Sequence, residues 1–322
     1  MRSLITVIKD IFRDAVSASY EMFKVMIPVI IVVKLLQELG LIAYLAWPLK
    51  PIMGLVGLPA EMGLVWATAI VNTTYAGLIV FLSLVGDTPL TSAQATVLAV
   101  LILVAHALPM ESSIARRSGA RFLFQCIIRL AGAFTLGWLL NRIYSATGTM
   151  QEPATVLFRM DPQAAADPSL ATWAMDQGMN LLSIFGVILA LLVMMRLLDI
   201  LGVIRLMNTI LRPILKLIGI GTKASAITVI GLTMGLSYGG GLIISEARKG
   251  NVGKEDIFYS LTLMGLCHSL IEDTLLLALI GAHFSGIFWG RLIFAIVAMA
   301  AIVQVVRRLP PRIQNTYLWV GK

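Results

Sequence analysis

Two groups of ionisable side chains interrupt apolar segments of this sequence, at an offset of 162 positions. The first contains His106 and Glu111, and the second contains His268, Glu272 and Asp273. Because an imidazole or a carboxylate is costly to hold inside a bilayer, such groups by default mark a functional site. Imidazole and carboxylate ligands suit a divalent metal ion, and the same groups suit a proton relay or cation coupling. The spacing leaves these alternatives open.

Cys267 stands directly before His268 and is a further candidate ligand of the second group. Another interpretation of both groups is a buried polar network that holds two parts of the chain together. Two enzyme motifs are excluded, because the His-Glu-x-x-His pattern of zinc proteases is absent and residues 219–223 lack the spacing of a phosphate-binding loop. We therefore expect a binding or transport protein and not an enzyme.

The composition is that of a polytopic membrane protein. Of the 322 residues, 58% are hydrophobic and only 13% are charged, whereas soluble domains carry about 25% charged residues. The formal net charge of +8 is typical of the basic cytoplasmic loops of membrane proteins, so we expect no nucleic-acid partner. Cys126 and Cys267 both fall within apolar segments, where no disulfide framework is expected.

The sequence contains an internal repeat with the same offset that separates the two histidines. Residues 34–130 align with residues 196–292 without a gap. The identical pairs include glycine, histidine and arginine positions: Gly57 with Gly219, Gly77 with Gly239, His106 with His268, and Arg129 with Arg291. The chain is therefore predicted to consist of two homologous halves.

Each half contains four apolar segments, and the second segment of each half is interrupted at its centre. The interruptions are a polar run at 71–77 and a glycine-rich run at 234–241, and such runs favour a reversal of the chain. If each reversal is a re-entrant hairpin, each half crosses the membrane three times and the halves are inverted. The predicted fold is an all-α polytopic membrane protein with two inverted repeats, each with three crossings plus one re-entrant helical hairpin.

The basic residues favour this topology. With the N-terminus inside, 18 of the 25 lysines and arginines fall on the cytoplasmic side. Arg129 and Arg291 remain within apolar segments, and we expect both to extend toward an interface. The predicted organisation is an N-terminal amphipathic interfacial helix (1–23), repeat 1 (24–144), an external linker (145–175), repeat 2 (176–306) and a cytoplasmic tail (307–322), with short surface helices at 47–58 and 207–220. The location that we expect is a bacterial-type cytoplasmic (inner) membrane, with both termini in the cytoplasm.

The hairpin tips are candidate substrate-binding elements, because unwound backbone and polar side chains near the midplane can contact a ligand. The alternative is that the polar groups only satisfy the backbone of the tips. The candidate residues are Asn72, Thr73, Thr74, Tyr75, Ser237, Tyr238, Gly239 and Gly240.

Pro109 predicts a break in the third segment of the first half, beside His106, because proline removes a backbone donor. The break is needed to bring His106 and Glu111 together, since residues five apart diverge by about 140° on a continuous helix. In the second half, His268 and Glu272 are four apart, and we expect them to share one face of an unbroken helix.

The two inverted halves, the glycine-rich tip Ser237-Tyr238-Gly239-Gly240-Gly241 and the interrupted segments around His106 and His268 resemble the nucleoside-recognition, or Gate, family over roughly residues 24–306. That family includes the membrane part of bacterial ferrous-iron transporters and the spore maturation proteins A and B, with a more distant similarity to concentrative nucleoside transporters. The resemblance implies a transporter-like fold with hairpins at the site. The fused GTP-binding domain of the iron transporters and the scaffold helices of the nucleoside transporters have no counterpart in this sequence.

The leading functional hypothesis is an ion- or proton-coupled secondary transporter of a small polar solute of nucleoside-like type, bound between the two hairpin tips. The alternatives are a divalent-metal permease that uses the His/Glu/Asp groups and a membrane scaffold that transports nothing. No cofactor is expected beyond a coupling cation (a proton or sodium) or a divalent metal. The expected partners are the lipid bilayer and the solute or cation, with a homo-oligomer as an open alternative.

Overall fold

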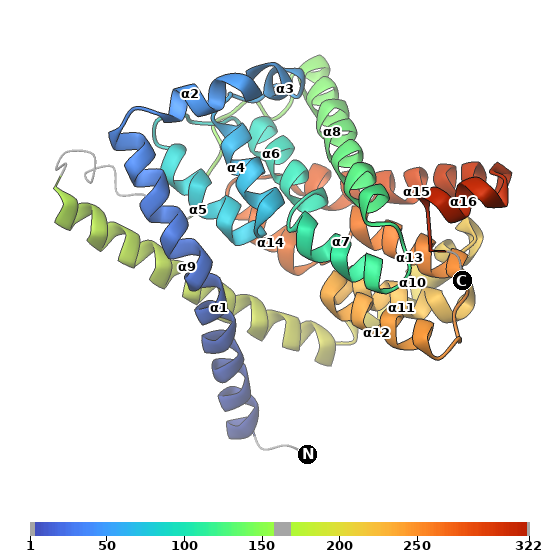
Figure 1. Cartoon of the computed structure of the whole chain (residues 1–322). Coiled ribbons are helices and arrows are strands. Elements are labelled where there is room, and N and C mark those ends of the chain that lie inside the picture. Colours follow the sequence, from blue (N-terminus) through green and yellow to red (C-terminus); the bar gives the residue numbers. More distant parts are fainter. Residues whose placement is uncertain (1–3, 158–168, 321–322) are drawn as a thin grey trace.

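The computed structural model describes residues 4–157 and 169–320 (Figure 1). At residues 4–8, 237, 238 and 248 it describes the backbone alone. The regular elements of the described residues are all helices, which confirms the all-α fold. In the described part of the chain, five helical segments are long and apolar enough to cross a membrane: Lys9–Glu38, Ser92–Arg117, Phe122–Thr147, Leu170–Ile200 and Ser285–Arg308. The segment from 257 to 280, the sixth predicted crossing, is not among them and forms two short helices.

The chain reverses at both predicted interruptions. The first hairpin joins α4 (Met62–Val71) to α5 (Thr74–Leu84), and the second joins α11 (Thr222–Met234) to α12 (Leu236–Arg248). The turn of the second hairpin is Gly235, whose φ of 97° is unfavourable for other residues. The glycines at 239–241 therefore lie inside α12 and do not form an unwound tip.

Small residues allow the two arms of each hairpin to pack closely. A Cβ atom on Gly77 would lie 2.8 Å from the Cβ atom of Ala69, and a Cβ atom on Gly239 would lie 2.5 Å from the Cα atom of Gly231. Both contacts join residues eight positions apart across a turn. The repeated glycine pair Gly77 and Gly239 thus has the same packing role in both halves.

The third segment is broken in both halves. In the first half, α6 (Ser92–Val104) and α7 (Leu108–Arg117) are separated by residues 105–107, and Ala107 has a left-handed φ of 47°. In the second half, α13 (Lys254–Leu266) ends before His268, and Ser269 has a φ of 48°. The break beside Pro109 is confirmed.

The expectation of an unbroken second copy is wrong. The chain leaves the helical conformation after Leu266 and resumes it in α14 (Glu272–Ala278) without any proline in between. Both restarted helices carry an acidic residue in the first turn, where the helix macrodipole favours negative charge. The two breaks therefore share an acidic residue in the first turn of the helix that follows.

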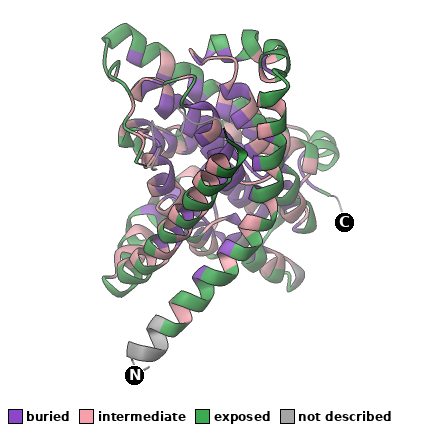
Figure 2. Ribbon diagram, turned by 90° about the vertical axis from the view of Figure 1, so that its left-hand side faces the viewer, coloured by how far each residue is buried: buried purple, intermediate pink, exposed green. Residues whose placement is uncertain are grey.

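Three long helices and one shorter helix complete the two halves: α1 (Leu4–Glu38), α8 (Phe122–Thr147), α9 (Leu170–Ile200) and α15 (Arg291–Arg308), the last preceded by a π-helical turn at Ser285–Gly290. Helices α1 and α9 pack against each other on the outside, and the N-terminal part of α1 projects from the body (Figures 1 and 2). We expected a separate helix at 1–23, but α1 continues through residue 23, since no glycine or proline interrupts the helix there.

Short helices occupy the predicted surface positions. In the first half they are α2 (Ile42–Ala46), a 3₁₀ turn (Trp47–Leu49) and α3 (Lys50–Leu55), whereas in the second half a single helix, α10 (Val203–Ile218), takes this place. The last described helix is α16 (Pro311–Tyr317). Buried residues concentrate at the centre of the molecule, around α6 and α13, and exposed residues lie on the outer helices (Figure 2).

The loop that follows the first hairpin and the turn that precedes the second hairpin lie beside different parts of the chain. The loop after α5 packs against the segment at 148–157, which in turn contacts the C-terminal end of α14. The turn that opens the second hairpin packs against α13 and the C-terminal end of α15. The contacts are Ala154 N to Leu90 O (2.9 Å) and Leu157 N to Leu279 O (2.8 Å) in the first region, and Gly221 N to Asp256 Oδ1 (2.8 Å) and Gly219 against Arg307 in the second.

Candidate functional site

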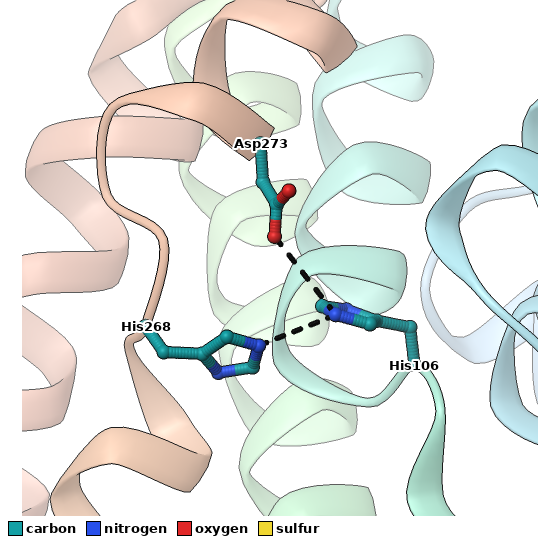
Figure 3. A group of neighbouring side chains, drawn as sticks. All are labelled: His106, His268 and Asp273. Carbon is teal, nitrogen blue, oxygen red and sulfur yellow. Dashed lines mark hydrogen bonds and ion pairs between the residues drawn. The ribbon is translucent and has the colours of Figure 1, made fainter. Parts of the chain in front are cut away.

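The two broken helices bring His106 and His268 together at the centre of the molecule, with the Nε2 atom of each ring directed toward the other (Figure 3). Their Nε2 atoms are 3.2 Å apart, and the ring centroids are 5.0 Å apart. Both side chains are buried, with 6% and 2% of the residue surface exposed. The sequence placed these histidines at equivalent positions of two repeats, and the structure brings them into direct contact.

Each imidazole is fixed by a backbone carbonyl one turn earlier. Nδ1 of His106 lies 2.9 Å from the carbonyl oxygen of Ile102, and Nδ1 of His268 lies 2.8 Å from that of Met264. A carbonyl oxygen only accepts hydrogen bonds, so each Nδ1 carries the proton and donates it. In the neutral rings, both Nε2 lone pairs then face each other, and their repulsion is relieved by a proton on one of them or by a cation between them.

Two carboxylates flank this pair of nitrogens. Oε1 of Glu111 lies 3.2 Å from Nε2 of His268 and 3.7 Å from Nε2 of His106. Oδ2 of Asp273 lies 3.9 Å from Nε2 of His106, and Figure 3 shows this contact as a dashed line. Glu111 and Asp273 occupy aligned positions in the two halves, each in the first turn of a restarted helix. We call these four residues the central cluster.

Arg129 holds Glu111 in place and was missed as a site residue. We expected its side chain to extend to an interface, but only 1% of the residue is exposed. Its Nη1 atom donates to Oε2 of Glu111, while Nε and Nη2 donate to the carbonyl oxygens of Val104 (2.9 Å) and His106 (2.8 Å). These two carbonyls belong to the break after α6, where the end of the helix leaves acceptors without helical donors. The guanidinium therefore stabilises both the break and the carboxylate.

Two predicted members of the group lie apart from the imidazoles. Glu272 begins α14 and is partly buried, and Cys267 is completely buried. Among the contacts of the described residues, neither side chain reaches His106 or His268. The break in α13 separates Glu272 from the face that His268 occupies, which a continuous helix would have joined.

The first hairpin tip uses its polar groups mainly on itself. Thr73 Oγ1 accepts from Ala76 N and caps α5, and Thr74 and Tyr75 are buried. Asn72 lines an apolar cavity of about 420 Å³ between the hairpin and α1, away from the central cluster.

The second tip is less accessible to a ligand than its sequence indicates. Gly239 packs against Gly231, and a Cβ atom on Gly240 would lie 2.5 Å from a methyl group of Ile114 in α7. The side chains of Ser237 and Tyr238 are outside the described part of the structure.

Each hairpin also contacts the neighbouring break. In the first hairpin, Ala69 O accepts a hydrogen bond from Ala107 N (2.9 Å).

The second hairpin makes the matching contact through Leu232 O, which accepts from Leu270 N at 2.8 Å. The two breaks that carry the histidines are thus each braced by one hairpin. The hairpins contact the breaks through their backbone, and Tyr75 of the first tip lies within electrostatic reach of Glu272 and Asp273.

Three ligand atoms of the central cluster have separations close to those of a tetrahedral metal site. Two nitrogen or oxygen ligands about 2.0 Å from such an ion lie about 3.3 Å apart, and the separations among His106 Nε2, His268 Nε2 and Glu111 Oε1 are 3.2, 3.2 and 3.7 Å. The ligand atoms of His106, His268 and Asp273 also lie within 4.8 Å of one another. Metal-binding histidines typically donate the other ring N–H to a carbonyl, and ligating carboxylates are themselves hydrogen-bonded; this cluster has both features.

No family model matches the chain, and no solved structure matches it. The chain is similar to a protein of Bacillus subtilis (strain 168) named uncharacterized membrane protein YvoD. The two sequences are 27% identical over 310 residues, which cover 94% of this chain and 97% of the relative. The similarity and the long apolar helices together identify a multi-pass membrane protein. The resemblance to the nucleoside-recognition family remains a prediction.

Proposed function

We propose that this chain is a membrane transporter for a divalent transition-metal ion and that the central cluster binds the ion during transport. The observation that carries the proposal is the pair of buried imidazoles whose Nε2 atoms face each other at 3.2 Å while both Nδ1 atoms are held by carbonyls. Two neutral nitrogens and two carboxylates form a ligand set that suits zinc, iron, cobalt or nickel.

The surroundings of the cluster support a transported ion. The ligands lie at breaks of two aligned segments, and broken helices at the midplane are typical of transporters with inverted repeats. We propose that the two halves are inverted, and the different regions against which the two hairpins open support this. The ion would then be exposed to one side by movements of the first hairpin and to the other side by movements of the second.

The geometry favours a metal ion over a polar solute. Thr73 of the first tip caps its own hairpin, and in the second hairpin Gly239 and Gly240 pack against Gly231 and Ile114. The central cluster, in contrast, points its ligand atoms at one small volume. A metal ion is therefore the substrate class that this site fits best.

Uptake of Co²⁺ into proteoliposomes that contain a metal-sensitive dye tests the proposal. We expect the unmodified protein to take up Co²⁺ and both His106→Ala and His268→Ala to reduce the uptake rate. The reduction should exceed the roughly 10- to 100-fold effect that is typical when a residue that hydrogen-bonds a metal ligand is removed. His283→Ala is the matched control, because the third histidine of the chain contacts Ser285 outside the cluster. Equal uptake by all three variants, or no uptake by the unmodified protein, would refute the proposal.

A further inference from the structure

Arg291 is a buried cation whose hydrogen-bonding capacity is mostly unused. None of its surface is exposed, and its Nη2 atom donates to Oγ1 of Thr274 at 3.1 Å. The thiol of Cys267, which carries no charge, lies beside the guanidinium, and neither Nε nor Nη1 meets the geometry of a hydrogen bond to a described residue. A guanidinium stays charged in proteins, and a buried charge without a paired anion is strongly unfavourable.

The aligned arginine of the first half is fully paired. Arg129 and Arg291 are equivalent in the repeat, and Arg129 forms an ion pair with Glu111 and two hydrogen bonds with carbonyls. Glu111 precedes Arg129 by 18 positions, and Asp273 precedes Arg291 by the same interval. The structure thus contains one formed arginine–carboxylate pair and one that is open.

Arg291 already contacts the helical turn that carries Asp273. The present partner of Arg291 is Thr274, the residue next to Asp273 along the first turn of α14. Asp273 is turned instead toward the imidazole of His106, where its Oδ2 atom is 3.9 Å from Nε2. A second state with an Asp273–Arg291 pair requires the Asp273 side chain to turn away from His106 and α14 to shift relative to α15.

We propose that Arg291 is a positioning residue that takes Asp273 away from the central cluster in a second state of the protein and thereby releases the metal ion. This inference rests on the proposed function. In the state described above, Asp273 faces the ion and Arg291 is unpaired. In the second state, the arginine–carboxylate pair of the second half is formed like that of the first, and the ion, which then has only three ligands, is bound more weakly and leaves. The unfavourable burial of the unpaired Arg291 charge in the first state favours this exchange.

Comparison of Arg291→Met with Arg129→Met tests this role. In the described state Arg291 lacks a paired anion, so Arg291→Met should keep or raise the melting temperature, whereas Arg129→Met should lower it. We expect Arg291→Met to bind Co²⁺ within about threefold of the unmodified protein or more tightly, because Asp273 then stays with the cluster. Its maximal uptake rate should fall at least tenfold without a rise in KM, and Arg291→Lys should recover part of that rate.

A second variant acts on the present partner of Arg291. Thr274→Val removes the competing hydrogen bond, which should favour the pair with Asp273 and weaken Co²⁺ binding. A melting temperature of Arg291→Met that falls as far as that of Arg129→Met, or an uptake rate equal to that of the unmodified protein, would overturn the inference. Failure of the proposed function is distinguishable, because it appears in the unmodified protein as an absence of Co²⁺ binding.

Discussion

At the scale of single residues, the sequence predicted the ligands of the central cluster. It did not predict that the buried side chain of Arg129 holds one of them. His106, His268, Glu111 and Asp273 were recognised because ionisable groups in apolar segments are rare. Arg129 was assigned to an interface, because the depth of a side chain in a membrane protein depends on tertiary packing that composition does not contain. The equal 18-residue spacing of an arginine from the carboxylate in both halves was the signal that could have identified it.

Arg129 is expected to be essential for stability. Arg129→Met leaves the carboxylate of Glu111 buried without its partner, and breaking a buried ion pair in this way costs about 3–5 kcal/mol. Thermal unfolding in detergent micelles should show a clear decrease in melting temperature.

The double variant Arg129→Met with Glu111→Met is the control for that prediction. It removes both charges, so it should recover a large part of the stability, although two backbone carbonyls at the break keep no donor. A single variant as stable as the double variant would show that the ion pair does not hold the break together.

At the scale of the elements, sequence patterns located the hairpins and breaks but not their exact turns. The polar and glycine-rich runs marked both reversals, yet the second reversal occurs at Gly235, before the glycine triplet. Within the triplet, Gly239 packs against Gly231 of α11 and Gly240 packs against Ile114 of α7. Likewise Pro109 marked the first break, while the second break, at Ser269, lacks a proline and was not predicted. A left-handed residue in a broken helix depends on the contacts that hold it, which local sequence does not specify.

The packing of the second hairpin gives a matched pair of variants. Gly239→Ala adds a Cβ atom 2.5 Å from the Cα atom of Gly231, whereas Gly241→Ala, in the same helix, adds one with no neighbour within 4 Å. Overpacking typically costs about 1–3 kcal/mol, while alanine improves helix propensity equally at both positions. We expect Gly239→Ala to unfold at a lower temperature than the unmodified protein and Gly241→Ala at the same or a higher one. The reverse order would contradict the close contact of α11 and α12.

At the scale of the whole molecule, composition was sufficient to predict a polytopic membrane protein, and the offset of 162 positions was sufficient to predict two halves with the same order of elements. The sequence could not show that the two histidines meet, because the repeat gives equivalence and not distance. Their contact follows from the packing of the first break against the second, which involves residues far apart in the chain.

The proposed inversion of the halves predicts where the loops after the two hairpins lie. Asp87 follows the first hairpin and Lys254 follows the second, and both are exposed. In intact cells, a membrane-impermeant thiol reagent should label Asp87→Cys from outside, while Lys254→Cys should react only after the membrane is opened. Cys126 and Cys267 are at least partly buried, so the unmodified protein serves as the background control. Labelling of both positions from the same side would refute the inversion.

The central claim is that the two histidines and their carboxylates bind a metal ion, and titration of the purified protein with Co²⁺ tests it most directly. Visible absorption reports the geometry of bound Co²⁺, and the endpoint reports the stoichiometry. We predict one Co²⁺ ion per chain with the intense bands of tetrahedral coordination, absent in the His106→Ala/His268→Ala double variant and unchanged in His283→Ala. A protein that shows no such bands, or a double variant that retains them, would contradict the account.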